Sequence, residues 1–181
     1  MPVANGKGAM KPILNIKDAE SRHITNGNVF EARVAPLAER LGGARIGANV
    51  TTVPPGKAAY PLHHHFGNEE HSFVVSGSGT LRFGNTTYPV APGDYIVTPP
   101  GGAGLAHQLV NTGSDDLVYL ALSTKALPEV VGYPDSGKTG VAAEPIAESR
   151  FLIDDAARNA VSYYDGEDGA RIRELTRKRA A

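Results

Sequence analysis

The 181-residue sequence has no cysteine, which excludes disulfides, thiolate metal sites and cysteine nucleophiles. It has no excess of either charge: the formal net charge is -1, so nothing favours nucleic acid or an anionic membrane as a partner. Long apolar runs are also missing, both near the N-terminus, where a signal peptide would need one, and elsewhere, where a membrane span would. We therefore expect a cytoplasmic protein that binds neither nucleic acid nor a membrane.

The sequence does contain many turn-forming residues, at a spacing typical of β-structure. Its 21 glycines and 13 prolines favour short strands joined by tight turns. Strand-like runs separated by Gly, Pro, Asn and Ser turns lie at 46–53, 62–66, 70–75, 80–83, 87–90, 95–98, 108–111 and 117–123. This spacing predicts an all-β sandwich or barrel, and the absence of an internal repeat favours a single barrel.

The flanks differ from this central region. We divide the chain into an N-terminal arm (1–45), a β-barrel (46–125) and a C-terminal extension that packs on the barrel (126–181). Within the arm, residues 1–28 are expected to be irregular, 29–34 to form an edge strand and 36–42 a short helix. Within the extension, residues 128–140 are expected to form a loop. The last twelve residues, 170–181, form a basic, helix-favouring tail without interleaved aromatics, so we interpret it as a solvated helix.

Histidine is concentrated in one short segment. Four of the six histidines and two adjacent carboxylates fall between His63 and His71. His63 and His65 are two residues apart, so both rings point to the same face of an extended chain. Together with a carboxylate just past a turn, such a pair can bind a divalent metal.

The spacing around this segment resembles the first conserved motif of the cupin superfamily. The motif reads His63-x-His65, four residues, Glu70 and then six residues before Gly77. The six-residue step to Gly77 selects Glu70 as the motif carboxylate in preference to its neighbour Glu69.

A second block is similar to the second cupin motif. Gly93 is followed after five residues by Pro99-x-Gly101, and His107 is followed after three residues by Asn111. Five residues separate Gly101 from His107 where the usual pattern has two, which lengthens a glycine-rich loop but keeps the spacing from His107 to Asn111. Residues 133–138 and 163–167 further resemble a subgroup of single-domain bacterial cupins.

The resemblance implies a double-stranded β-helix, or jelly-roll, barrel with short terminal extensions, a minor helix and one divalent metal in the barrel mouth. Carried over residue by residue, the metal ligands are His63, His65, Glu70 and His107. Three imidazoles and one carboxylate suit zinc, manganese, iron, cobalt or nickel better than magnesium or calcium, which prefer oxygen ligands. Four protein ligands leave one or two positions for water or a substrate oxygen.

Other side chains near the histidine segment receive structural interpretations. His64 has the opposite parity to its neighbours and should point away from the metal face, and His71 should also face outward. Tyr60, Tyr95 and the loop 101–106 are expected near the barrel mouth.

Residues 132–139 match the P-loop pattern letter for letter. A phosphate-binding P-loop requires a strand immediately before it and a helix immediately after it. Gly140 follows at once, Pro145 prevents a long helix, and an all-β fold has no parallel sheet. We therefore do not expect a nucleotide site here.

Three functions are compatible with the implied metal site. The preferred one is a metal-dependent enzyme that acts on a small polar substrate, in the manner of the sugar-phosphate isomerases of the superfamily. The alternatives are an Fe(II)-dependent dioxygenase and a non-catalytic protein that binds a small molecule or a metal. Because jelly-roll barrels commonly pair through sheet edges, we also expect a homodimer formed through the N-terminal strands.

Overall fold

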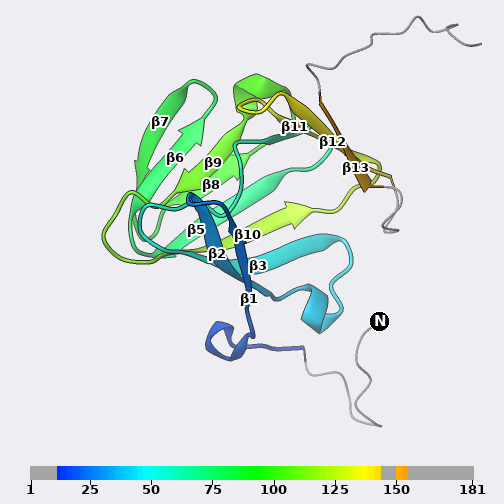
Figure 1. The fold of residues 1–181 in the computed structure, drawn as a ribbon. Coiled ribbons are helices and arrows are strands. Elements are labelled where there is room, and N and C mark those ends of the chain that lie inside the picture. The colour runs from blue at the N-terminus through cyan, green and yellow to red at the C-terminus, as the bar shows by residue number, and fades with distance from the viewer. Residues whose placement is uncertain (1–11, 144–149, 155–181) are drawn as a thin grey trace, which may run out of the picture.

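The computed structural model describes residues 12–143 and 150–154, and its regular structure is almost entirely β (Figure 1). The strands are β1 (Arg22–Asn26), β2 (Phe30–Pro36), β3 (Ile46–Val53), β4 (His64–His65), β5 (Glu70–Ser76), β6 (Gly79–Phe83), β7 (Thr86–Val90), β8 (Tyr95–Thr98), β9 (His107–Val110), β10 (Leu117–Thr124), β11 (Glu129–Tyr133), β12 (Lys138–Ala142) and β13 (Arg150–Asp154). Short 3-10 turns occur at η1 (Ile16–Asp18), η2 (Glu39–Leu41) and η3 (Ala103–Leu105). No helix in these residues is both long enough and apolar enough to span a bilayer.

The strands form two layers. One layer is a six-stranded sheet in the order β1-β2-β3-β10-β5-β8. The other combines a three-stranded sheet, β7-β6-β9, with a four-stranded sheet, β13-β12-β11-β4. These two sheets meet where His63 and His107 form an antiparallel bridge and exchange both backbone hydrogen bonds. The result is the all-β, jelly-roll barrel that the motif resemblance implies.

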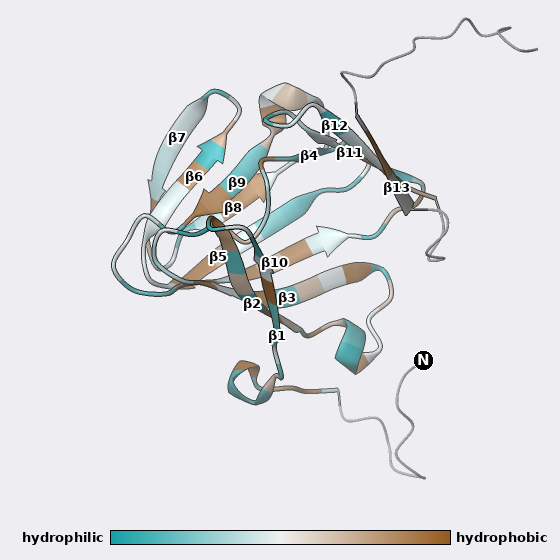
Figure 2. Ribbon diagram, viewed as in Figure 1, coloured by the Kyte–Doolittle hydropathy of each residue, from teal (hydrophilic) through white to brown (hydrophobic). Residues whose placement is uncertain are grey.

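The hydrophobic core lies between the two layers. Val74 of β5 and Leu117 of β10 come from the six-stranded sheet, whereas Leu81 of β6 and Val90 of β7 come from the opposite layer, and all four belong to one buried cluster. Figure 2 shows hydrophobic (brown) and hydrophilic (teal) stretches within the strands, and burial alternates along β6, where Gly79 and Leu81 are buried and Thr80 and Arg82 are less so. This alternation is the period-two pattern of a sheet with one buried face.

One glycine and one asparagine of the sequence motifs have structural roles. Gly77 adopts a φ of 78°, and a Cβ there would collide with the carbonyl oxygen of Asp116. Asn111 is fully buried, and its amide donates to the carbonyl oxygens of Val53 (2.7 Å) and Asp115 (2.8 Å). Gly77 and Asn111 therefore fix turns of the barrel.

The predicted strands are largely confirmed. The strands at 46–53 and 95–98 have the predicted bounds, and the other central strands differ by a few residues at most, except that the run at 62–66 shortens to the two residues of β4. The predicted helix at 36–42 is a single 3-10 turn, η2, which ends at Gly42 in the left-handed conformation.

Three predictions about the flanks are wrong. The strand expected at 29–34, β2, is not an edge strand, because it pairs with β1 on one side and β3 on the other. Residues 22–26, expected to be irregular, form β1 along the edge of the larger sheet. Residues 128–140, expected to be a loop, contain β11 and most of β12, which form a hairpin. The predicted basic tail at 170–181 lies outside the described residues.

Candidate metal centre

Four side chains converge at one end of the barrel. His63, His65, Glu70 and His107 each place a possible ligand atom within 4.8 Å of the others. All four are partly buried, and their side chains are between 12% and 29% exposed. The structure thus brings together all four residues to which the cupin resemblance assigns metal binding.

The two layers of the barrel contribute different ligands. His107 is the first residue of β9, and its backbone pairs with that of His63, so the two imidazoles lie side by side with ring centroids 4.6 Å apart. His65 lies two residues further along the same chain and therefore projects from the same face. Glu70 is the first residue of β5 in the opposite layer. The cluster therefore exists only where the two layers meet.

Backbone carbonyls orient two of the imidazoles. The Nδ1 atom of His63 lies 2.8 Å from the oxygen of Pro61, and Nδ1 of His107 lies 3.4 Å from the oxygen of Leu105. Because a carbonyl can only accept, Nδ1 of each ring carries a proton, which leaves Nε2 as the atom that faces Glu70 and that can give its lone pair to a metal. This is the tautomer in which a histidine binds a metal through Nε2.

The Nε2 atoms surround the carboxylate of Glu70. They lie 2.9 Å (His107), 3.4 Å (His65) and 3.7 Å (His63) from its oxygens. Burial alone would raise the pKa of Glu70, but the hydrogen bond with His107 and the close contacts with His63 and His65 outweigh it and hold this pKa far below its usual range. Glu70 is therefore an anion at neutral pH.

His65 supplies the observation that tests whether a metal fits. Both of its ring nitrogens are buried, and in the described part of the chain neither makes a hydrogen bond of good geometry: the facing carboxylate oxygens lie 3.4 Å (Glu70, from Nε2) and 3.5 Å (Glu129, from Nδ1) away. Burial lowers the pKa of His65, yet the carboxylates of Glu70 and Glu129 on either side raise it overall. An unsatisfied buried nitrogen that faces an ionised carboxylate, beside two further imidazoles, fits a divalent cation.

The cluster opens into a pocket of about 280 Å³. Polar groups in its wall include three tyrosines, Tyr60, Tyr119 and Tyr133. Burial is the main cause that raises the pKa of all three phenols, so each hydroxyl stays neutral at physiological pH and can donate a hydrogen bond. None of the described residues in this wall is Lys or Arg.

A second, larger hollow of about 830 Å³ lies behind β11 and β12. It shares Val131 and Tyr133 with the first pocket but contains none of the four clustered residues. The smaller pocket is therefore the one that joins the titratable cluster to solvent.

The other residues singled out in the sequence lie outside the cluster. His64 is buried and its Nδ1 lies 2.7 Å from the oxygen of Gly101, so it packs in the barrel wall. His71 contacts Glu69 and the hydroxyl of Tyr95. Tyr60 lines the pocket, whereas Tyr95 is 60% exposed and does not, so the expectation that Tyr95 lies at the mouth is wrong.

The loop between Gly101 and His107 folds into the 3-10 turn η3, which is why its extra length does not displace His107. The P-loop match at 132–139 forms the end of β11, a turn and the start of β12. A hairpin has no helix N-terminus to bind a phosphate, in agreement with the sequence interpretation.

Sequence reasoning missed two residues that border the site. Glu129 lies 3.5 Å from His65, and the ring of Tyr133 lies 6.3 Å from that of His63. Both belong to β11, which lies within the range 128–140 for which the sequence predicts a loop. The β-branched pair Val130-Val131, directly before the turn signals Pro134 and Gly137, is the signal that could have predicted this strand.

Comparison with known proteins agrees with this geometry. The family model for the cupin domain matches residues 49–123. The barrel is a cupin domain. Its match includes all four clustered residues and ends before β11, so the cupin model does not cover the hairpin that carries Glu129 and Tyr133.

Several individual proteins are similar to this cupin. A provisionally assigned sugar phosphate isomerase from Acidithiobacillus ferrooxidans is 28% identical with a TM-score of 0.74, covering 84% of this chain and 97% of that one. A predicted oxalate decarboxylase from Thermotoga maritima is 25% identical with a TM-score of 0.55, covering 63% of this chain and 99% of that one. An oxalate-binding protein of the same organism is 33% identical over 70 residues, which are 39% of this chain and 54% of that protein.

Proposed function

We propose that this cupin is a metal-dependent enzyme that acts on a small, oxygen-rich substrate, in the manner of a sugar phosphate isomerase. The observation that carries the proposal is the position of the His63, His65, Glu70 and His107 cluster at the base of a 280 Å³ pocket with neutral tyrosine hydroxyls in its wall. A divalent transition metal held by these residues would polarise a carbonyl and stabilise the negative charge that develops on its oxygen.

The protein's own side chains would orient the substrate. Tyr60 and Tyr133 line the pocket beside His63, and their neutral hydroxyls can donate to substrate oxygens. The amide of Gln108 is already engaged, because it accepts from Arg82 (2.8 Å) and donates to the Tyr60 carbonyl (2.8 Å). Gln108 therefore shapes the wall of the pocket.

The comparison with the Acidithiobacillus ferrooxidans protein supports an isomerase over other metal enzymes, since that relative matches beyond the cupin domain, over 84% of this chain. Because no described Lys or Arg lines the pocket, we expect the reacting carbonyl end of a phosphorylated sugar to enter it and the phosphate to stay outside.

The test is isomerisation or solvent exchange at a carbon next to a carbonyl. The metal-loaded protein is incubated in D₂O with a panel of aldose and ketose phosphates, their unphosphorylated sugars and keto acids, and NMR follows product formation and deuterium incorporation. We expect turnover with at least one substrate, its loss in His63→Ala and its retention in His71→Ala, a matched histidine outside the cluster. No turnover with any substrate, with the metal confirmed bound, would refute the isomerase.

The second candidate is a protein that binds a small carboxylate such as oxalate. The similarity to the oxalate-binding protein of Thermotoga maritima favours it. Because the described wall of the pocket has no Lys or Arg, the metal would have to balance the negative charge of such an anion. Calorimetric titration of oxalate into metal-loaded protein, with no chemical change by NMR, would support this candidate. Oxygen uptake by the iron-loaded protein would instead support the dioxygenase.

We also propose that the protein is a homodimer that pairs through β1. In the described part of the chain β1 is hydrogen-bonded only to β2, which leaves its other edge open. Light scattering coupled to size exclusion tests this, and a monomer at micromolar concentration would contradict it.

A further inference from the structure

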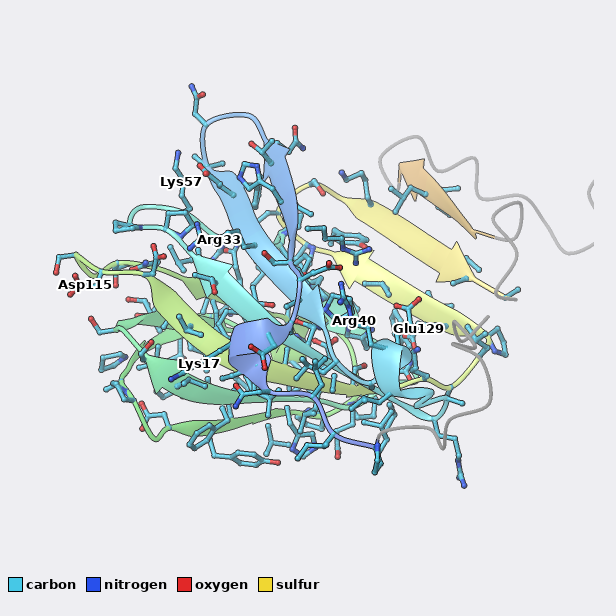
Figure 3. The ribbon with its side chains drawn as sticks, turned by 90° about the horizontal axis from the view of Figure 1, so that it is seen from below. Lys17, Arg33, Arg40, Lys57, Asp115 and Glu129 are labelled. Atoms are coloured by element: carbon cyan, nitrogen blue, oxygen red, sulfur yellow. The ribbon has the colours of Figure 1, made fainter. Side chains whose placement is uncertain are left out.

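A buried carboxylate outside the four-residue cluster lies against one of its histidines. Glu129 is the first residue of β11 and is 6% exposed, and it is among the side chains labelled in Figure 3. Its Oε1 atom lies 3.5 Å from Nδ1 of His65. Among the described residues, His65 is the ion-pair partner of Glu129, and no Lys or Arg pairs with this carboxylate. A buried carboxylate without such a cation is costly and calls for another reason to be there.

The backbone fixes the distance between the two side chains. Strand β11 pairs with β4 in the register Val131 opposite His65, and the amide of Phe66 donates to the oxygen of Val130 at 3.0 Å. In this antiparallel register residue 129 falls opposite residue 67, which makes Glu129 the diagonal neighbour of His65 on the same face of the two segments. Strand pairing therefore brings Glu129 within reach of His65.

Asn68 fixes the orientation of the carboxylate. The Asn68 oxygen accepts from the amide of Ala126 (2.7 Å) and the hydroxyl of Thr124 (2.9 Å), so its NH₂ group must point the other way. That NH₂ group donates to Oε2 of Glu129. The remaining oxygen, Oε1, faces Nδ1 of His65 and the amide of Gly67 (3.4 Å). Oε1 thus faces one backbone donor and one ring nitrogen that can donate.

His65 differs in this respect from the other two imidazoles of the cluster. His63 and His107 place Nδ1 against backbone carbonyls two residues earlier. His65 has no such carbonyl, and its Nδ1 faces Glu129 instead. A carboxylate partner fixes the tautomer of a metal-binding imidazole and strengthens it as a ligand more than a neutral carbonyl does.

We propose that Glu129 is a positioning residue of the metal centre: its carboxylate accepts the Nδ1 proton of His65 and so directs the Nε2 lone pair toward the metal. This inference rests on the metal site proposed above. It adds a residue from the β11–β12 hairpin, beyond the part of the chain that the cupin model matches. The hairpin thereby becomes part of the site.

The substitution Glu129→Gln tests this sharply. The Asn68 NH₂ group donates directly on one side, whereas the Gly67 amide on the other side is 3.4 Å away, so we expect the new amide to turn its oxygen to Asn68 and its NH₂ group to His65. Nδ1 of His65 then has to accept, which moves the proton to Nε2 and blocks metal binding by that atom. We expect Zn²⁺, measured by competition with a chelating dye, to bind 10- to 100-fold more weakly.

Two further variants complete the experiment. Glu129→Asp keeps the charge but shortens the reach, so it should weaken Zn²⁺ binding less than Glu129→Gln does. Glu69→Gln is the matched control, since Glu69 forms the same kind of contact with His71 (2.8 Å) outside the cluster and should leave Zn²⁺ affinity unchanged. If Glu129→Gln fails to fold, unchanged affinity in Glu129→Asp still overturns the proposal.

A second measurement distinguishes positioning from a structural role. Long-range ¹H–¹⁵N spectra of metal-free, ¹⁵N-histidine-labelled protein at pH 9 report the tautomer of His65, which should be Nδ1–H in the wild type and Nε2–H in Glu129→Gln. Lower thermal stability with the same tautomer and the same Zn²⁺ affinity would overturn the proposal. If the wild type binds no Zn²⁺ but the tautomer changes as expected, Glu129 still positions His65 and the proposed metal function fails.

Discussion

The guanidinium of Arg82 on β6 forms a two-point ion pair with the carboxylate of Asp135, with N–O distances of 2.7 and 3.0 Å. Asp135 lies in the turn between β11 and β12, so this pair ties the tip of the hairpin to the sheet that carries His107. The Nη1 atom of Arg82, which donates to Asp135 at 2.7 Å, also donates to the side-chain oxygen of Gln108 (2.8 Å). The pair therefore holds the β11–β12 hairpin, with its residues Glu129 and Tyr133, beside the cluster.

Removal of this pair should loosen the hairpin without unfolding the barrel. Both side chains are partly exposed, so Arg82→Gln should cost less than about 1 kcal/mol of global stability. Amide hydrogen exchange in β11 and β12 should nevertheless accelerate, while exchange in β3 and β10 should not change. Equal exchange rates in the hairpin of wild type and variant would contradict the proposed tie.

The same pair predicts a pH dependence. Its hydrogen bond with Arg82 is the main cause that holds the pKa of Asp135 below its usual value. The stabilisation is therefore present above the ordinary aspartate pKa of about 3.9 and is lost as the pH falls through the lower native pKa. An NMR titration should show the pKa of Asp135 below that ordinary value in the wild type and close to it in Arg82→Gln. An unchanged pKa in the variant would show that another group causes the shift.

A close contact between Gly132 and His64 predicts a packing defect. A Cβ at residue 132 would collide with Nε2 of the buried His64 ring, whose Nδ1 is held by Gly101. Gly132→Ala should therefore destabilise the protein by about 1–3 kcal/mol, because the ring or strand β11 must move. Gly102→Ala, where nothing lies within 4 Å of the new methyl group, is the control and should change thermal stability little.

The sequence predicted the parts of the site that are close in the chain or that belong to a spaced motif. His63, His65 and Glu70 fall within eight residues, and strand parity places the two histidines on one face. His107 required the second motif, since nothing local links it to the others. Glu129 could not be predicted in this way. Its contact with His65 spans 64 positions and depends on the pairing of β11 with β4.

The same physical reason explains the errors in the flanks. Strand β1 is an edge strand whose residues are mostly exposed, so its sequence shows no alternation of apolar and polar residues. The hairpin β11–β12 contains Pro134 and Gly137, which indicate a turn correctly, but the strands on either side owe their stability to pairing with distant segments. Pairing of this kind leaves a weak local signal.

Asn111 predicts a clear separation between stability and metal binding. Its buried amide makes three hydrogen bonds that tie residues 53, 113 and 115 together. Asn111→Ala leaves these backbone groups without partners and should cost about 1–3 kcal/mol. The exposed Asn85→Ala should cost little. Since Asn111 does not face the cluster, metal affinity measured below the melting temperature should stay the same, and a large loss would show that it shapes the site.

Divalent transition metals should stabilise the protein through the cluster. At a free metal concentration 100-fold above the dissociation constant, binding adds about 2.7 kcal/mol to the free energy of unfolding, which is readily seen as a rise in melting temperature. Three imidazoles and one carboxylate should respond to Zn²⁺, Co²⁺, Ni²⁺ or Mn²⁺ and hardly to Mg²⁺ or Ca²⁺. The rise should disappear in His107→Ala and persist in His71→Ala, whose imidazole contacts Glu69 and Tyr95 away from the cluster. An equal rise with Mg²⁺, or an undiminished rise in His107→Ala, would place the bound metal elsewhere.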